Sequence, residues 1–187
     1  MAKKRRNKIM KIILDKWNSQ RLMMSNLKEE EISLVQDLYE TSRYMNQWDG
    51  QEYNPEHIKN CFFEGHLPPD GKVENYRIQT IRNNKDQKII GILSVYHGYP
   101  AIECIYLEFL YIDKSIQKQG FGQEVINQFT ELTTELGYKE IRINVSIKNW
   151  LAIKFWIQSG FNNVCGIYGD SEYSEHTYAN LELIKIL

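Results

Sequence analysis

The sequence is poor in the features that mark several classes of protein. It has three cysteines among 187 residues, Cys61, Cys104 and Cys165, with no paired spacing and no histidine cluster beside them. That pattern argues against a disulfide framework and against a zinc site, and it favours reduced thiols. No apolar run approaches the roughly 20 residues of a membrane-spanning helix. We therefore expect a cytoplasmic protein with no bound metal and no membrane partner.

Net charge is also almost absent. The 23 lysines and arginines nearly balance the 24 aspartates and glutamates, and the formal charge is -1. A nucleic-acid partner is therefore not expected for the body of the protein. The exception is a basic N-terminal arm over residues 1–19, which is predicted as either a disordered, solvated tail or a helix. Lys11, Asp15 and Lys16 interrupt its apolar residues, so we expect no signal peptide.

The length allows one domain with a substantial core. The chain shows neither an internal repeat nor a linker, so a single domain is predicted over residues 20–187. Apolar periodicity and breaker residues predict its strands and helices. Strands are predicted over 21–25, 76–81, 89–96, 102–112, 140–145, 163–168 and 177–186, helices after Asn26, after Pro55, over 121–136 and over 149–160, and a loop over 44–53.

Residues 117–123, Gln-Lys-Gln-Gly-Phe-Gly-Gln, lie between a predicted strand and a predicted helix. Gly120 and Gly122 let the backbone turn tightly and present its N–H groups, and the following helix directs its positive end to the same point. A diphosphate would fit there. The same residues could equally form only a turn and a helix start, so a second motif has to decide.

That second motif follows about thirty residues later. Asn149, Ala152, Trp156, Gly160 and Phe161 match, with one exception, the pattern Asn-x-x-Ala-x-x-x-Tyr-x-x-x-Gly-Phe. Together the two motifs resemble the GNAT superfamily of acyl-CoA-dependent N-acyltransferases, specifically over about residues 105–161 and in element order over 20–187. The resemblance implies an α/β (α+β) fold, in which a mixed, mostly antiparallel and splayed central sheet is flanked by helices.

The resemblance also implies acetyl-CoA as the acyl donor. The backbones of Leu110 and Ile112 would pair with its pantetheine arm as a neighbouring strand does. Asn149 would face the cofactor, although at a helix start it could equally be the N-cap, and Phe155 is either a cofactor contact or a core residue. The diphosphate would be held by the loop residues Gln117, Lys118, Gly120, Phe121, Gly122 and Gln123.

Acetyl transfer to an amine requires a base. An ordinary alkylamine has a pKa of about 10.4, so its deprotonation at pH 7 costs roughly 4.6 kcal/mol. The candidate catalytic residue is Glu108, which by strand alternation should share a face with Tyr106, Leu110 and Ile112. The alternative is a strand glutamate that faces solvent, and a bulge in this strand could reverse the alternation.

Trp156 is the clearest departure from the family pattern, because relatives often carry a tyrosine there as the acid that protonates the departing thiolate. An indole N–H can donate a hydrogen bond but no proton. Thiols have reference pKa values near 8.5, so the thiolate can leave with little acid help. We therefore expect turnover to survive, with Trp156 either lining the site or packing in the core.

The sequence thus predicts an N-acetyltransferase that moves an acetyl group from acetyl-CoA directly to a primary amine of a small molecule or peptide, in a ternary complex. No cysteine falls at a motif position, which argues against an acyl-enzyme. A homodimer is compatible with the sequence. Two alternatives stay open: a non-catalytic acyl-CoA sensor, suggested by Trp156, and an acetyltransferase that the basic arm docks to a ribosome or nucleic acid.

Overall fold

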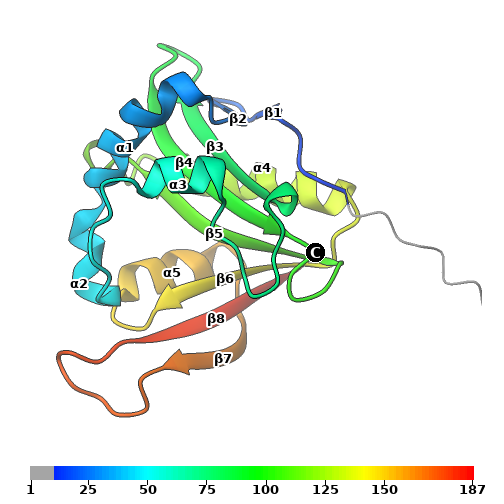
Figure 1. The fold of residues 1–187 in the computed structure, drawn as a ribbon. Helices are drawn as coiled ribbons and strands as arrows, with labels where there is room; N and C mark the ends of the chain where they lie inside the picture. Colours follow the sequence, from blue (N-terminus) through cyan, green and yellow to red (C-terminus); the bar gives the residue numbers. More distant parts are fainter. Residues whose placement is uncertain (1–10) are drawn as a thin grey trace, which may run out of the picture.

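The computed structural model describes residues 11–187, which form one eight-stranded sheet (Figure 1). The strand order is β1-β2-β3-β4-β5-β6-β8-β7, and every neighbouring pair is antiparallel except the parallel pair β5 and β6. This confirms the predicted mixed, mostly antiparallel sheet. The strands are β1 (Lys16–Asn18), β2 (Leu22–Asn26), β3 (Tyr76–Asn83), β4 (Ile89–His97), β5 (Cys104–Ile112), β6 (Glu140–Ser146), β7 (Asn163–Gly169) and β8 (Ala179–Ile186).

Helices cover the sheet on both faces (Figure 1). One buried cluster joins α1 and α3 to one face, and a second joins α4 and α5 to the other. Between residues 11 and 187, no helix is long and apolar enough to cross a membrane. The α-helices are α1 (Ile32–Glu40), α2 (Asn46–Asp49), α3 (His57–Phe63), α4 (Phe121–Glu135) and α5 (Trp150–Gln158), so part of the predicted loop over 44–53 is helical.

The sheet opens at its centre. Strands β5 and β6 pair only over their first three residues, from Cys104 opposite Glu140 to Tyr106 opposite Arg142. Beyond that point β5 pairs with β4 alone, and β6 pairs with β8 alone. We call the space between the diverging strands the β5/β6 opening. It is the splay that the family resemblance implies.

The sheet begins inside the segment predicted as an arm. Strand β1 pairs with β2, and Trp17 is 5% exposed in the core, where its indole N–H donates to Gln79 Oε1 at 2.8 Å. Ile13 is also buried. The strand therefore starts four residues before the predicted domain boundary, because burial of Trp17 and its bond to Gln79 hold it on the sheet. The rest of the predicted basic arm, residues 1–10, lies outside the described residues.

Candidate active site

The β5/β6 opening exposes one edge of β5. The N–H of Asp113 donates to Ile90 O in β4 at 2.8 Å, so it points away from the opening. Because successive N–H groups of a strand alternate between its two edges, those of Ile112 and Leu110 point into the opening. These are the residues predicted to pair with a pantetheine arm, and the edge they present has no strand partner among the described residues.

The loop that follows β5 presents free backbone N–H groups. Among residues 11–187, no hydrogen bond uses the N–H of Lys118 or Gly120. Lys118 and Gly120 have φ angles of 64° and 83°, and such left-handed residues fold consecutive N–H groups into a concave anion site. Helix α4 starts at Phe121 and adds the positive end of its dipole. The loop therefore presents backbone donors on a concave surface, and its binding of a diphosphate stays a prediction.

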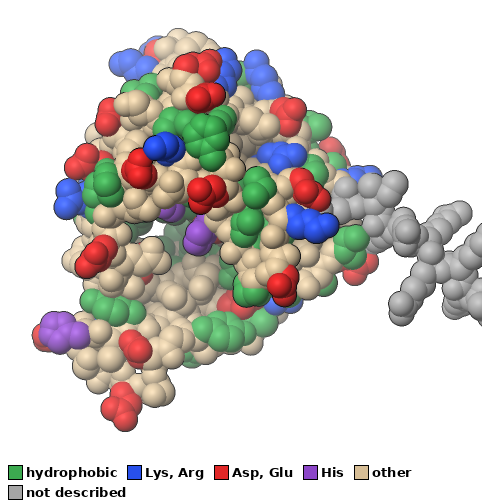
Figure 2. Space-filling view, viewed as in Figure 1, with side chains coloured by type: hydrophobic (Ala, Val, Ile, Leu, Met, Phe, Trp, Pro, Cys, Tyr) green, Lys and Arg blue, Asp and Glu red, His purple; other side chains and the backbone are tan. Residues whose placement is uncertain are grey.

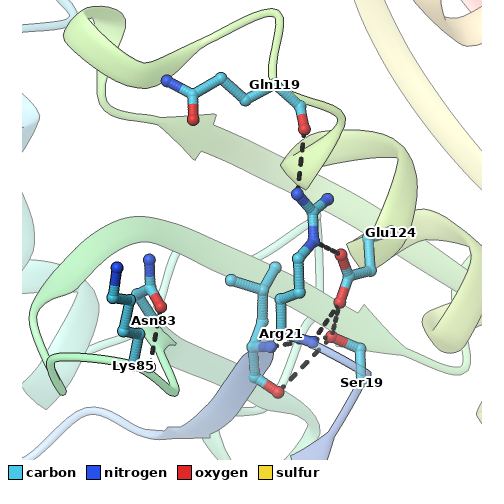
Figure 3. Close-up of polar contacts among 7 residues, drawn as sticks. Ser19, Arg21, Asn83, Lys85, Gln119 and Glu124 are labelled. Carbon is cyan, nitrogen blue, oxygen red and sulfur yellow. Dashed lines mark hydrogen bonds and ion pairs between the residues drawn. The ribbon is translucent and has the colours of Figure 1, made fainter.

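The carbonyl side of this loop is held by Arg21, just before β2 (Figure 3). Its Nη1 donates to Gln119 O at 3.2 Å, its Nε contacts Glu124 Oε2 at 2.6 Å, and its guanidinium lies 4.4 Å from the Phe121 ring centre. Glu124 Oε1 also accepts from the Arg21 N–H at 2.7 Å and from Ser19 Oγ at 2.6 Å. We call these contacts the Arg21–Glu124 clamp. They fix the loop against the start of α4.

The clamp also determines the charge of Glu124. Burial raises the pKa of this carboxyl, but hydrogen bonds from Ser19 and Arg21 outweigh it and hold the pKa below its usual range. A carboxylate in the first turn of α4 would repel a diphosphate at the helix N-terminus. Because Arg21 pairs with it, the negative charge is compensated within the clamp.

The other predicted loop residues have defined places. Gln117 Nε2 donates to Ile112 O at 2.8 Å and to Tyr44 OH at 3.2 Å, so it ties the loop to the end of β5. The Lys118 side chain is exposed. Gln123 Oε1 accepts from Ser159 Oγ at 3.0 Å, which joins α4 to the end of α5.

Helix α5 places the remaining two predicted residues. Asn149 is its N-cap, as Oδ1 accepts from the Ala152 N–H at 3.1 Å. Phe155 lies against the start of α4, where a Cβ built on Gly122 would stand 3.5 Å from its ring. The glycine thus gives Phe155 room between the two helices. Asn149 and Phe155 thus both have structural roles in the protein. Neither role prevents a contact with the cofactor, which stays a prediction.

Glu108 is the extra residue of a β-bulge. Ser94 pairs with Phe109 whereas the next residue, Val95, pairs with Leu107. Ser94 Oγ donates to Glu108 Oε2 at 2.8 Å. The bulge lies two residues past Tyr106, the last β5 residue paired with β6, so Glu108 lies where the β5/β6 opening begins.

The predicted common face of Tyr106, Glu108, Leu110 and Ile112 was wrong. Tyr106 packs against the cluster under α1 and α3, whereas Leu110 and Ile112 belong to the cluster under α4 and α5. The bulge inserts one residue between them and so reverses the alternation. Glu108 lies on the α1/α3 face, because its carboxylate bonds Ser94. The Ser94 side chain points to this face, since that of the next residue, Val95, points to the other.

A cavity of about 160 Å³ lies beside Glu108 on this face. His66 Nδ1 contacts Glu108 Oε1. The Glu108 side chain is 18% exposed and that of His66 is 66% exposed, so the imidazole contacts both the carboxylate and solvent. Figure 2 shows the face hollowed beneath its α1 and α3 half, with histidine side chains at the edge of the hollow. The lining residues are His66, Leu67, Pro68, Tyr96, Tyr99, Tyr106 and Glu108.

Trp156 is a core residue. It is 8% exposed, and its ring lies 4.9 Å from that of Phe155 and 5.1 Å from that of Phe161, both at steep interplanar angles. Edge-to-face packing of this kind stabilises an aromatic cluster. The residue that replaces the family tyrosine therefore packs α5 onto the sheet and brings no acid to the site.

Sequence reasoning missed His66, Ser94 and Arg21. His66 lies in an irregular segment after α3, and Arg21 is 103 residues from Glu124. Neither belongs to a motif with defined spacing. The one available signal was the polar Ser94 within the otherwise apolar strand 89–96, since a buried hydroxyl requires a partner.

A family model described as "Acetyltransferase (GNAT) family" matches residues 35–161, more than half of the chain. Among solved structures, the chain is similar to RimL, a ribosomal L7/L12 α-N-protein acetyltransferase in complex with coenzyme A, at a TM-score of 0.70 and 16% identity, with 95% of this chain and 98% of that one covered. It is also similar to an acetyltransferase from Thermus thermophilus, at a TM-score of 0.69 and 18% identity over 91% and 100% of the two chains.

A third similar structure is a spermidine N-acetyltransferase chimera from Vibrio cholerae and hSSAT. Its TM-score is 0.68 at 17% identity, over 89% of this chain and 96% of that one. At these identities the structural likeness establishes the fold alone. The family itself is established by the match over residues 35–161.

Proposed function

The chain belongs to the GNAT family of acetyltransferases, and we propose that it moves an acetyl group from acetyl-CoA to a primary amine of a small molecule or peptide. Transfer is direct, within a ternary complex. The observation that carries this proposal is the position of Glu108, a residue at the start of the β5/β6 opening that also lines a cavity. Donor and acceptor can therefore meet at one carboxylate.

The donor side is built from backbone groups. The N–H groups of Leu110 and Ile112 would hold the pantetheine arm, and those of residues 117–120 with the start of α4 would hold the diphosphate. Acetyl-CoA would supply the acetyl group as an activated thioester. The residues of the opening bind and orient it, which raises the effective concentration of the two reactants.

Glu108 acts as the base on the acceptor side. Its carboxylate already accepts from Ser94 and contacts His66, and a carboxylate has about four acceptor positions, so positions remain for an ammonium. The carboxylate takes the proton of the amine as the nitrogen–carbon bond to the acetyl group forms. The carbon–sulfur bond breaks and its electron pair leaves on the thiolate. No cysteine lines the cavity, which supports direct transfer.

Calorimetry with acetyl-CoA tests the donor site. Gly120→Trp should abolish binding, because a side chain at φ 83° strains the loop that presents the N–H groups. The matched control is Gly137→Trp, at the other end of α4, where φ is 85° and no atom lies within 4 Å of an added Cβ. Equal binding by both variants would overturn the assignment of residues 117–123.

Free CoA release with a panel of primary amines tests the reaction. We expect release that depends on the amine, with the acetylated amine identified by mass spectrometry. Tight acetyl-CoA binding with no release across the panel would instead identify an acyl-CoA sensor.

A further inference from the structure

The cavity beside Glu108 has the composition of a site for an organic cation. Three of its seven lining residues are tyrosines, and Glu108 is the one carboxylate among them. The Tyr99 ring lies 6.5 Å from that of Tyr96 at 85°, and 6.0 Å from that of Tyr106 at 58°. The three rings thus form successive, angled walls around one negative charge.

These walls offer ring faces more than hydroxyl groups. The Tyr96 hydroxyl already accepts from the Lys72 N–H at 2.8 Å and from Asn75 Nδ2 at 3.3 Å. Leu67 and Pro68 complete the lining with apolar surface. A ring face attracts a cation through its quadrupole, and apolar walls favour the methylene groups of a ligand. An ammonium group on an aliphatic chain satisfies both the carboxylate and the walls.

The volume limits how much of that chain the cavity can bury. An engineered apolar protein cavity of about 150 Å³ holds benzene, which has six heavy atoms. The cavity of about 160 Å³ therefore holds a ligand portion of similar size. A nitrogen and five methylene groups reach that size. In the α-amine of a polypeptide, by contrast, the carbon next to the nitrogen is branched, and its peptide group would face the apolar walls.

We infer that this cavity selects an unbranched aliphatic primary ammonium of four to five carbons as the acetyl acceptor. This inference rests on the proposed function, which fixes neither the length nor the shape of the amine. A free alkylamine and the side chain of a lysine share this chemistry. Both would place the nitrogen at Glu108 and the methylene groups between the tyrosine rings.

A chain-length series of n-alkylamines from methylamine to octylamine is the first test. Each methylene buried should raise kcat/KM about fourfold, and the increase should stop at about five carbons, where the cavity is full. A five-carbon amine branched next to the nitrogen should be at least tenfold poorer than n-pentylamine. A flat series, or equal rates for the two isomers, would overturn the inference while leaving acetyl transfer intact.

Variants of the cavity wall supply the second test. Tyr99→Leu keeps an apolar wall but removes a ring face, so the KM for n-pentylamine should rise about threefold to tenfold with little change in acetyl-CoA affinity. Phe63→Leu is the matched control, because it removes a 54% exposed ring three residues before His66 and outside the cavity. An unchanged KM in Tyr99→Leu contradicts the cation site.

The source of the amine is distinguished with peptides. An N-terminally acetylated peptide with one lysine presents only the side-chain amine, and the same peptide with a free N-terminus and norleucine in place of lysine presents only the α-amine. Acetylation of the first indicates a protein acceptor, and acetylation of n-pentylamine alone indicates a small molecule. Preference for the second peptide would overturn the inference.

Calorimetry of n-pentylamine on the CoA complex separates this inference from the proposed function. Binding that Tyr99→Leu weakens, together with no CoA release, would refute the proposed function and retain the ammonium site. CoA release without preferential binding of n-pentylamine would refute the ammonium site and retain the proposed function.

Discussion

Arg21 and Glu124, 103 residues apart in the chain, form a 2.6 Å ion pair that joins the start of β2 to the first turn of α4. The guanidinium also bonds the carbonyl of Gln119 in the diphosphate loop. The pair is partly exposed, at 44% and 15% for the two side chains, so its direct contribution to stability is modest. Its larger effect is on the charge and shape of the loop.

Arg21→Gln should weaken acetyl-CoA binding about tenfold at low salt, because the uncompensated Glu124 carboxylate then repels the diphosphate. The double variant Arg21→Gln with Glu124→Gln should recover most of the affinity. Lys59→Gln, which breaks an exposed pair with Glu56, is the control.

Acetyl-pantetheine, which lacks the diphosphate, should bind Arg21→Gln and the wild type equally. Equal losses of affinity for acetyl-pantetheine and acetyl-CoA would show that Arg21 acts only on folding. Calorimetry at two salt concentrations measures the electrostatic part of the affinity that Arg21→Gln loses.

Trp156→Phe and Trp156→Tyr should have the same kcat. The two variants differ by one hydroxyl, and a thiolate with a reference pKa near 8.5 leaves without an acid. Both should lower the free energy of unfolding by about 1–2 kcal/mol, because each leaves part of the aromatic cluster unfilled. A kcat at least tenfold higher for the tyrosine variant would show that protonation of the thiolate limits the rate.

His97 should make folding sensitive to acid. It is fully buried, and its Nδ1–H donates to Asn75 O at 2.7 Å while its Nε2 accepts from the Ile13 N–H at 3.1 Å. The bond from Ile13 requires an unprotonated Nε2 and therefore a neutral ring, and burial lowers the pKa of His97 from 6.5 to about 4. The depressed pKa means that its stabilisation is complete above pH 6.5 and is lost as the pH falls toward 4.

Over that range the loss amounts to roughly 3 kcal/mol. Urea unfolding at pH 7.5 and pH 4.5 measures it, and His97→Gln, which cannot titrate, should show a correspondingly smaller difference between the two values. The same pH dependence in both proteins would assign the acid sensitivity to other groups.

The parts that the sequence predicted well are those encoded locally. Alternating apolar residues predicted the central strands, and the spacing of Gly120 and Gly122 predicted the loop and the start of α4. Asn149 was correctly considered as an N-cap. Each of these features depends on residues within a few positions of one another, so periodicity and capping chemistry suffice to find them.

The parts that the sequence did not predict depend on distant pairing. The bulge at Glu108 arises from the register of β5 against β4, and strand β1 exists because Trp17 bonds Gln79, 62 residues away. The contact of His66 with Glu108 spans 42 residues. Nothing in the local sequence of these segments specifies the partner, so the direction of the Glu108 side chain could only come from the fold.

The role of Glu108 is tested most directly by steady-state kinetics of Glu108→Gln across pH 6–10, with n-pentylamine as acceptor. We expect kcat/KM to fall by a factor of about 100 or more at pH 7, and much of this loss to be recovered at high pH, where the free amine forms in solution. Acetyl-CoA affinity should stay unchanged, as it should in the exposed control Glu64→Gln. A Glu108→Gln rate and pH profile equal to those of the wild type would show that Glu108 is not the base.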